Sequence, residues 1–315
     1  MAKRNGPRCW IGIDEAGYGP NLGPLVMTAV VAAGEGADRP DLWNELAGLV
    51  DRAGGQSDRL WVDDSKRVYA GRKGRDRLRD GTLAVLASAG LGIPADVRNL
   101  IAVLDPTDST YGELSGWLEP PLVPESLPST PLTTLRCDRW AVVAAHARVV
   151  GPARFNQLVA EEGTKAGAHG RIFQEVVKAA WDGRGESTCN LQADKHGGRH
   201  RYLALLHRAW PDAWIERGLE GAVTSQYRLT RSGRHLEIEF RVRADRDDGL
   251  VALASMVSKY VRERWMEQFH GFWSRRVAGL RPTAGYPTDA RRYRSQIETT
   301  ALSLGMAHTR WWRER

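Results

Sequence analysis

The sequence predicts an α/β protein built around one mixed sheet. Short apolar runs typical of strands alternate along the 315 residues with longer segments of helical periodicity. Carboxylates recur where the apolar runs end, and no internal repeat is visible. We expect a single domain over residues 1–315. It carries an irregular Pro-rich insertion at about 104–132 and a helical, basic C-terminal extension at about 270–315.

The elements follow from these patterns in chain order. Strands are expected at 10–13, 25–31, 60–62, 140–150, 188–193, 223–229 and 236–242. Helices are expected at 39–53, 72–89, 173–181, 250–269 and 289–304, with a loop entering a helix over 197–210. The first two strands lie at hairpin distance, and so do the last two. The segment 250–269 is the clearest helix because its apolar residues share one face.

Composition favours a nucleic-acid partner and a protein of the cytoplasm. The net charge of +7 favours polyanions. The tail 310–315 sets two tryptophans between arginines, which could stack on bases or pack on the core. Cys9, Cys137 and Cys189 are widely spaced, form no zinc-type pair and suit a reducing compartment. Because neither a signal-peptide pattern nor a membrane-length apolar run is seen, we expect a cytoplasmic monomer with no membrane contact.

Four carboxylates stand at the ends of three predicted strands: Asp14, Glu15, Asp194 and Asp245. Sites in α/β sheets gather where neighbouring strands end, so these side chains can converge. Such a cluster is strongly repulsive unless divalent cations neutralise it. Oxygen-only ligands favour Mg²⁺ or Mn²⁺ over zinc, and two such ions would serve phosphodiester hydrolysis. The alternative for Asp14 and Glu15 is a polar turn between two strands.

The opening motif resembles that of the type 2 ribonucleases H (ribonuclease HII). It reads Ile-Asp-Glu-Ala-Gly-Tyr-Gly-Pro over 13–20, followed by Gly23-Pro24. Further segments are similar to other motifs of this family: Asp64-Ser65-Lys66, the Ala- and Ser-rich helix that follows Asp245, Gly-Tyr-Pro-Thr over 285–288, and His308. The likeness covers residues 10–308 discontinuously.

This resemblance implies a ribonuclease H-like fold, in which a central mixed sheet is flanked by helices. It implies that Asp14, Glu15, Asp194 and Asp245 bind two Mg²⁺ or Mn²⁺ ions and carry catalysis. The implied activity is hydrolysis of the RNA strand of an RNA–DNA hybrid, or a cut 5′ to a ribonucleotide embedded in duplex DNA. Asp194 lacks the Gly that usually follows in the family, so Asp182 and Asp247 are rival ligands.

Substrate binding is expected at Gly17, Tyr18, Gly19, Lys66 and Tyr286. The glycines let the backbone approach a ribose and its 2′-OH, Tyr286 offers a ring for a neighbouring sugar, and Lys66 offers a charge for phosphate. Tyr18 stands where the family usually has Arg, and Pro287 replaces a Gly. Two alternatives therefore stay open on the same fold: a DNA nuclease and a non-catalytic nucleic-acid-binding protein.

Overall fold

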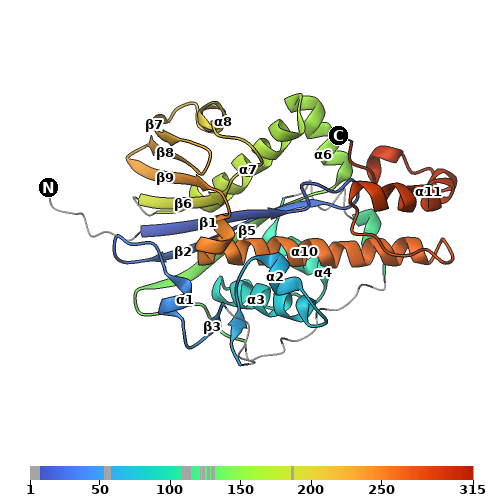
Figure 1. Ribbon diagram of the computed structural model, residues 1–315, viewed down its shortest axis with the longest axis horizontal. Coiled ribbons are helices and arrows are strands. Elements are labelled where there is room, and N and C mark those ends of the chain that lie inside the picture. Colours follow the sequence, from blue (N-terminus) through green and yellow to red (C-terminus); the bar gives the residue numbers. More distant parts are fainter. Residues whose placement is uncertain are drawn as a thin grey trace.

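A seven-stranded mixed sheet forms the centre of the protein (Figure 1). The computed structural model describes residues 8–52, 58–107, 115–120, 122, 125, 128, 132–185 and 188–314. The strand order is β5-β2-β1-β6-β9-β8-β7. The bounds are β1 (Arg8–Ala16), β2 (Leu25–Gly34), β5 (Trp140–Val150), β6 (Thr188–Asp194), β7 (Trp214–Glu220), β8 (Thr224–Arg231) and β9 (Arg234–Arg241). β1 runs antiparallel to β2 and parallel to β6, and β9 is parallel to β6, so the expected mixed sheet is confirmed.

Helices cover both faces of this sheet, each over its own apolar core (Figure 1). On one face, α10 (Gly249–Ser274) crosses β1 and β2 and packs with α2 (Ser65–Tyr69), α3 (Gly74–Ser88) and α4 (Val97–Leu104). The opposite face is covered by α6 (Pro152–Glu162), α7 (Lys165–Trp181) and α8 (Leu203–Ala209). The expected α/β arrangement, a sheet flanked by helices, is therefore confirmed. Among the described helices, none has the length and apolar character that a membrane span requires.

The remaining elements are short or peripheral. They are α1 (Leu42–Glu45), the two-stranded sheet of β3 (Val50–Asp51) and β4 (Leu60–Trp61), α9 (Ala244–Asp247), α11 (Pro287–Ser303), and the 3₁₀ turns η1 (Ser115–Trp117) and η2 (His308–Arg310). The helix expected over 39–53 is wrong. Asp41 caps α1, because its side chain accepts a hydrogen bond from the Asn44 backbone N–H. Val50 then pairs with Leu60 as a strand.

α10 lies directly across β1 because Gly12 leaves room for it. A Cβ atom at Gly12 would lie 2.3 Å from the backbone carbonyl carbon of Leu250. Successive residues of a strand point to opposite faces, so the two adjacent acids at the end of β1 separate. Asp14 faces α10, where the hydroxyl of Ser258 donates to its carbonyl. Glu15 faces α7.

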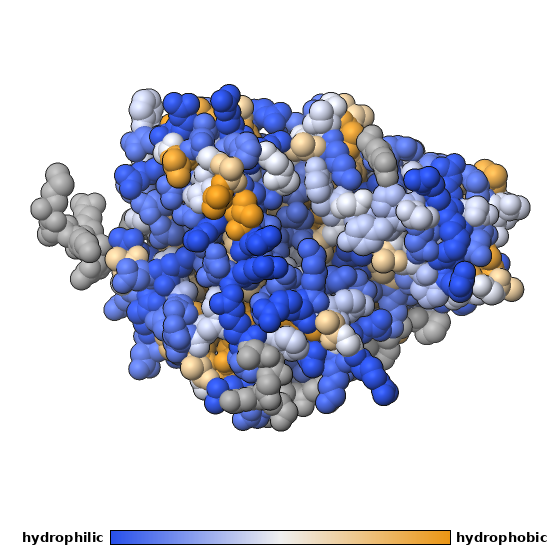
Figure 2. Space-filling view, viewed as in Figure 1, coloured by the Kyte–Doolittle hydropathy of each residue, from blue (hydrophilic) through white to orange (hydrophobic). Residues whose placement is uncertain are grey.

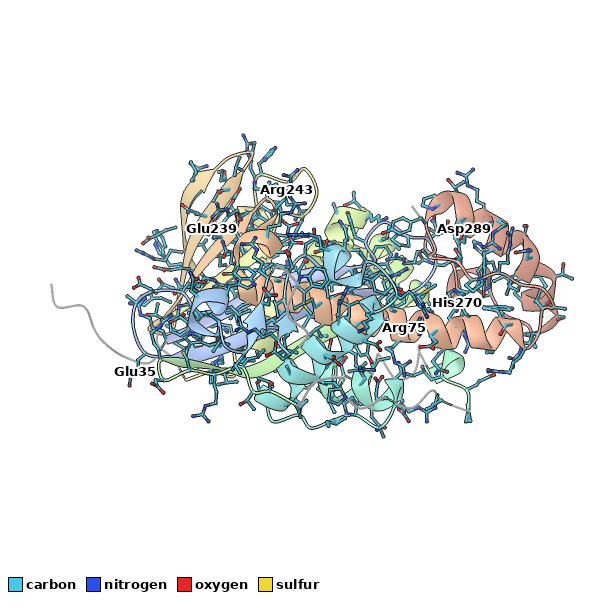
Figure 3. All side chains as sticks on the ribbon, turned by 60° about the horizontal axis from the view of Figure 1, so that its bottom comes forward. Glu35, Arg75, Glu239, Arg243, His270 and Asp289 are labelled. Atoms are coloured by element: carbon cyan, nitrogen blue, oxygen red, sulfur yellow. A yellow bond between two sulfur atoms is a disulfide. The ribbon has the colours of Figure 1, made fainter. Side chains whose placement is uncertain are left out.

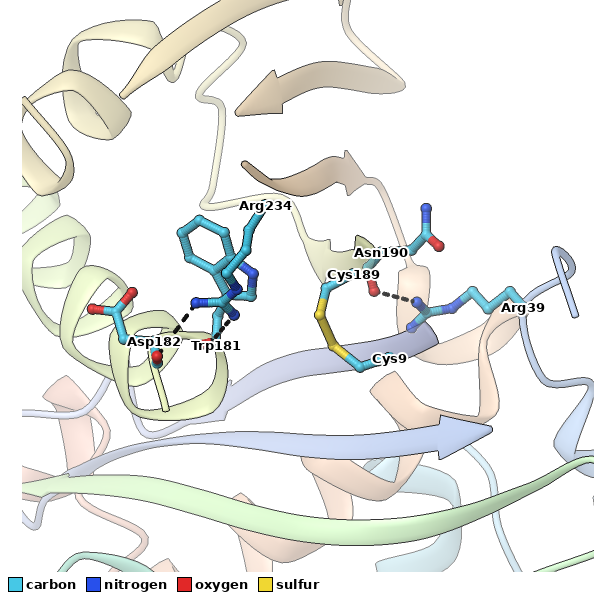
Figure 4. Close-up of a disulfide and its surroundings, with 7 residues drawn as sticks. All are labelled: Cys9, Arg39, Trp181, Asp182, Cys189, Asn190 and Arg234. Atoms are coloured by element: carbon cyan, nitrogen blue, oxygen red, sulfur yellow. Dashed lines mark hydrogen bonds between the residues drawn. A yellow bond between two sulfur atoms is a disulfide. The ribbon is translucent and has the colours of Figure 1, made fainter. Parts of the chain in front are cut away.

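A disulfide joins Cys9 of β1 to Cys189 of β6 (Figure 4). The two residues are directly opposed in the parallel register, both are fully buried, and their Cα atoms are 4.5 Å apart. Cys137 is free. The expectation that all three cysteines would stay reduced is therefore wrong. Two residues 180 positions apart become neighbours only when β1 and β6 pair.

The tail and part of the insertion pack on the body of the protein. Trp311 and Trp312 are buried, so they do not form an exposed surface on which bases could stack. Most of the Pro-rich insertion lies outside the described residues. Of its described part, Trp117 packs edge-on against Trp265, and Glu125 accepts hydrogen bonds from Tyr260 and Arg264 of α10.

Candidate active site

The C-terminal ends of three parallel strands bring the predicted carboxylates to one edge of the sheet. Residues 13 and 193 are paired between β1 and β6, so Asp14 and Glu15 leave the sheet beside Asp194. Asp194 is in turn paired with Arg241 at the end of β9. Asp245 follows in α9, one turn beyond that strand. The strand register thus brings the strand ends that carry these acids to one edge of the sheet, and their convergence on a common ion stays a prediction.

Asp14 is the most enclosed member of this group, at 8% exposure. Burial raises the pKa of its carboxyl well above the usual value, and the charges of Glu15, Asp245 and Asp194 raise it further. A hydrogen bond from the Ser255 side chain opposes this shift in pKa. An ionised Asp14 is therefore costly in the bare protein and favoured by a nearby cation.

Asp194 positions Asp245 by capping the short helix that carries it. The Asp194 carboxylate accepts a hydrogen bond from the Ala244 backbone N–H at 3.3 Å. Burial raises the pKa of Asp194, while its backbone hydrogen bonds lower it. Burial also raises the pKa of Asp245 to about 6, with contributions from the charges of Asp64 and Asp194. Lys66 lowers the Asp245 pKa, which places this exposed lysine beside the cluster.

Two residues join this group that sequence reasoning did not assign to it. Asp64, at the N-terminus of α2, is buried and acts on Asp245 as a fifth negative charge. His169 of α7 is 1% exposed, and its Nε2 lies 3.5 Å from Oε1 of Glu15. In the sequence, Asp64 could have been found as an acid that follows a short strand and precedes Ser65. No sequence pattern indicates that His169 lies at this site, because its position depends on how α7 crosses the sheet.

The rival ligands lie elsewhere. Asp182 follows α7 near the start of β6, at the opposite end of the strand from Asp194 (Figure 4). It pairs with Arg231 at 3.6 Å. Asp247 is exposed and pairs with Arg241 at 3.3 Å. The charges of Asp194 and Asp245 are among the main causes of the raised pKa of Asp14, and those of Asp182 and Asp247 are not.

The donor chemistry of this edge fits a hard divalent cation. The five carboxylates offer only oxygen ligands, and their mutual repulsion is relieved by positive charge. As they stand, no three His, Cys, Asp or Glu side chains within the described parts of the chain are grouped closely enough to hold a metal ion. Asp14 and Glu15 point to opposite faces of β1, and the charge of Glu15 still raises the pKa of Asp14.

Of the predicted substrate-binding residues, Gly17, Tyr18 and Gly19 lie in the loop between β1 and β2, and Tyr286 lies against this loop. Gly17 has φ +90°, and a Cβ atom there would lie 2.4 Å from the carbonyl oxygen of Pro24. At Gly19 a Cβ atom would lie 3.4 Å from the ring of Tyr286, which is 56% exposed. The Tyr18 ring packs instead against His169, with Lys165 over its face. Gly17, Gly19 and Tyr286 are thus adjacent, and the side chain of Tyr18 is turned toward α7.

The segment before Tyr286 is anchored on α10. The carbonyl of Gly285 accepts a hydrogen bond from the Asn21 backbone N–H at 2.8 Å. His270 of α10 accepts from the Thr283 backbone N–H at 3.2 Å. A cavity of about 480 Å³ lies here between α10, α2–α3 and the segment 282–284, with Arg75 and His270 among its lining residues (Figure 3). The face of the protein seen in Figure 2 is predominantly hydrophilic.

No protein-family model matches the chain, and no curated protein matches it. The chain is similar to solved structures of ribonucleases HII and HIII over nearly its whole length. The ribonuclease H2 from Pyrococcus horikoshii OT3 is 14% identical, with a TM-score of 0.42 over 96% of this chain and 92% of that one. The RNase HII of the PCNA:RNase HII complex from Archaeoglobus fulgidus is 15% identical, with a TM-score of 0.45 over 97% and 92%. Bst-RNase HIII in complex with Mn²⁺ is 18% identical, with a TM-score of 0.46 over 98% and 67%.

Proposed function

We propose that this protein is an endoribonuclease of the type 2 ribonuclease H class. It hydrolyses the RNA strand of RNA–DNA hybrids or cuts 5′ to a ribonucleotide embedded in duplex DNA. The observation that carries the proposal is that Asp14, Glu15, Asp194 and Asp245 follow the ends of neighbouring parallel strands at one edge of the sheet, beside a glycine loop and an exposed tyrosine. An acidic edge would repel phosphate unless cations bind there.

The four carboxylates are the proposed ligands of two Mg²⁺ or Mn²⁺ ions. When bound, such ions activate a water for in-line attack and stabilise the leaving oxygen. Within the chain, the Ser255 hydrogen bond orients the Asp14 carboxyl, and Asp194 holds α9 so that Asp245 stays at the edge. Lys66 lies on the exposed side, where it can meet a substrate phosphate.

Recognition of the ribose is assigned to the backbone of the Gly17–Gly19 segment and to the ring of Tyr286. Glycines allow a sugar to approach the main chain, and a 2′-OH can accept a hydrogen bond from a backbone N–H. The Tyr18 side chain packs on α7, which leaves its backbone for this contact. Substitution of the family's usual Arg by Tyr18 is therefore compatible with the proposal.

The test uses three duplexes of one sequence: DNA with one ribonucleotide, an RNA–DNA hybrid, and all-DNA. Each is incubated with Mg²⁺ or Mn²⁺ and with wild type or Asp14→Asn. Cleavage of a ribonucleotide-containing duplex that disappears in Asp14→Asn is expected. Cleavage of all-DNA would favour a DNA nuclease, and tight binding without any cleavage would favour a non-catalytic binding protein.

A further inference from the structure

Arg313, next to the C-terminus, is buried without a counter-charge. It is 1% exposed, and in the described part of the chain no carboxylate lies within ion-pair distance of it. Burial, together with the smaller effect of the Arg262 charge, lowers the pKa of Arg313 to about 9. A buried guanidinium of this kind is costly, so the contacts that hold it there must offset that cost.

Those contacts are to the backbone of the glycine loop. The Arg313 guanidinium donates hydrogen bonds from Nη2 to the carbonyls of Gly17 and Pro20. Its backbone N–H donates to the Asn21 carbonyl at 2.8 Å, and its own carbonyl accepts from Nδ2 of Asn21 at 2.9 Å. The ring of Phe155 lies 4.9 Å from the guanidinium carbon. Four hydrogen bonds therefore hold the tail against the loop.

A second buried arginine holds the far end of the same loop. Arg262 of α10, 3% exposed, donates from Nη2 to the carbonyls of Leu22 and Ala284, each at 3.1 Å. Its Nε would lie 2.6 Å from a Cβ atom at Gly17. The carbonyls of this loop are therefore drawn inward by two guanidinium groups.

The orientation of one peptide group follows from this arrangement. In a planar trans peptide the C=O of one residue and the N–H of the next point in opposite directions. Because the Gly17 carbonyl points at Arg313, the Tyr18 N–H points away from it. Gly17 can adopt this conformation, at φ +90°, since it has no side chain.

We infer that Arg313 is a positioning residue, which turns the Gly17–Tyr18 peptide so that its N–H faces a substrate ribose. The inference rests on the proposed function, since it assigns the Tyr18 N–H to the 2′-OH. Arg313 does not touch the substrate, because the loop covers it. Arg313 of the tail thus acts on nucleic acid through the loop that it holds.

The first test measures the loop itself by hydrogen exchange and needs no substrate. Arg313→Met removes the donors, and Arg313→Lys keeps the charge with a single point of contact. Arg294→Met is the matched control, because Arg294 lies over Trp312 of the same tail and pairs with Glu298 but does not contact the loop. We expect faster exchange over residues 17–22 in Arg313→Met, an intermediate rate in Arg313→Lys and no change in Arg294→Met. Unchanged exchange in Arg313→Met would overturn the inference.

The second test measures discrimination, which a merely structural tail would not alter. Affinities for duplex DNA with and without one ribonucleotide are compared by fluorescence anisotropy in Ca²⁺, which oxygen ligands also bind, and a gel after each measurement checks that the duplex is uncut. Arg313→Met should lose about tenfold in affinity for the ribonucleotide duplex, as for one lost hydrogen bond to a sugar. Its affinity for all-DNA should stay the same.

Equal losses on both duplexes would reduce Arg313 to a structural role and overturn the assignment to the ribose. Failure of the proposed function looks different: wild type would then bind the two duplexes equally. In that case the assignment of the Tyr18 N–H to the ribose is wrong as well. Hydrogen exchange still decides whether Arg313 holds the loop.

Discussion

At the scale of single residues, Asp14 combines two effects that act in the same direction. Its carboxyl is buried, and three other carboxylates raise its pKa further. A group in this position weakens the bare fold and is stabilised by a bound cation. The proposed function therefore makes a claim about stability as well as about cleavage.

Asp14→Asn should remove this coupling between cation binding and folding. Without divalent ions, we expect the variant to unfold at the same temperature as wild type or higher, because a neutral amide relieves the repulsion. Saturating Mn²⁺ should stabilise wild type by about 2–3 kcal/mol at a hundredfold excess over Kd, and Asp14→Asn far less. Thermal unfolding with and without Mn²⁺ measures both effects. An equal response of the two proteins to Mn²⁺ would contradict the assignment of Asp14 as a ligand.

Gly17 and Gly19 form a matched pair for testing the loop. Gly17→Ala should destabilise the protein by about 1–3 kcal/mol, because a Cβ atom would meet both Pro24 and Arg262 at an unfavourable φ. Gly19→Ala should change stability by no more than about 0.5 kcal/mol, since its nearest neighbour is the Tyr286 ring at 3.4 Å. Urea denaturation measures the difference. Similar losses at both positions would contradict the described loop.

The residues that the sequence predicted well are those whose position follows from local pattern. Acids at strand ends and an exposed tyrosine after a glycine can be found without coordinates. His169 and Arg313 could not be found in this way. Their positions depend on a helix that crosses the sheet and on a tail that returns to the first loop, 296 residues before it.

At the scale of elements, the central pair of parallel strands carries a covalent link. The disulfide between Cys9 and Cys189 closes a loop of 180 residues. We expect one thiol, Cys137, to react with an alkylating agent in denaturant without reductant. Reduction should expose two more thiols and lower the free energy of unfolding by about 2–5 kcal/mol. Three reactive thiols before reduction, counted by mass spectrometry, would contradict the pairing.

The junction of α10 with the Tyr286 segment predicts a dependence on pH. Burial lowers the pKa of His270, and the charge of Arg262 lowers it too; a hydrogen bond with the Thr283 backbone and the charges of Glu263 and Glu267 raise it by less. The unfolded chain therefore takes up this proton near pH 6.5 while the folded protein resists it, so stability falls as pH drops below about 6.5.

Urea unfolding at pH 7 and pH 5.5 tests this pH dependence of stability, because the change in unfolding free energy between the two pH values can be compared in two proteins. Other histidines titrate in the same range, so the comparison is between wild type and His270→Gln, whose side-chain oxygen can still accept from Thr283. Wild type should lose more stability between the two pH values than the variant does. The same loss in both would show that His270 is not the responsible group.

Sequence patterns predicted the long elements better than the short ones. α10 and β5 fall where periodicity placed them, because long amphipathic and apolar runs leave few alternatives. The helix predicted over 39–53 was wrong because tertiary contacts override the helical pattern of this segment. Arg39 there donates to the Ile11 and Asn190 carbonyls, which holds the chain extended before α1. β7, α4 and α6 were not predicted at all.

At the scale of the whole molecule, the order of strands explains why distant acids meet. β1, β6 and β9 are neighbours and parallel, so their ends bring residues from positions 14 to 245 to one edge. The sequence alone predicts where the strands lie along the chain but not their order in the sheet. The single-domain organisation over 1–315 and the monomeric state remain predictions, for which size-exclusion chromatography with light scattering is the check.

The measurement that tests the central claim most directly compares two acids of the same short helix. Asp245 belongs to the carboxylate edge, whereas Asp247 is exposed and paired with Arg241. Cleavage of DNA with one ribonucleotide is measured in Mn²⁺ for Asp245→Asn and Asp247→Asn. The account predicts a loss of about a hundredfold or more for Asp245→Asn, as for several kcal/mol of charge stabilisation, and near wild-type activity for Asp247→Asn. An active Asp245→Asn, or equal losses in both, would contradict it.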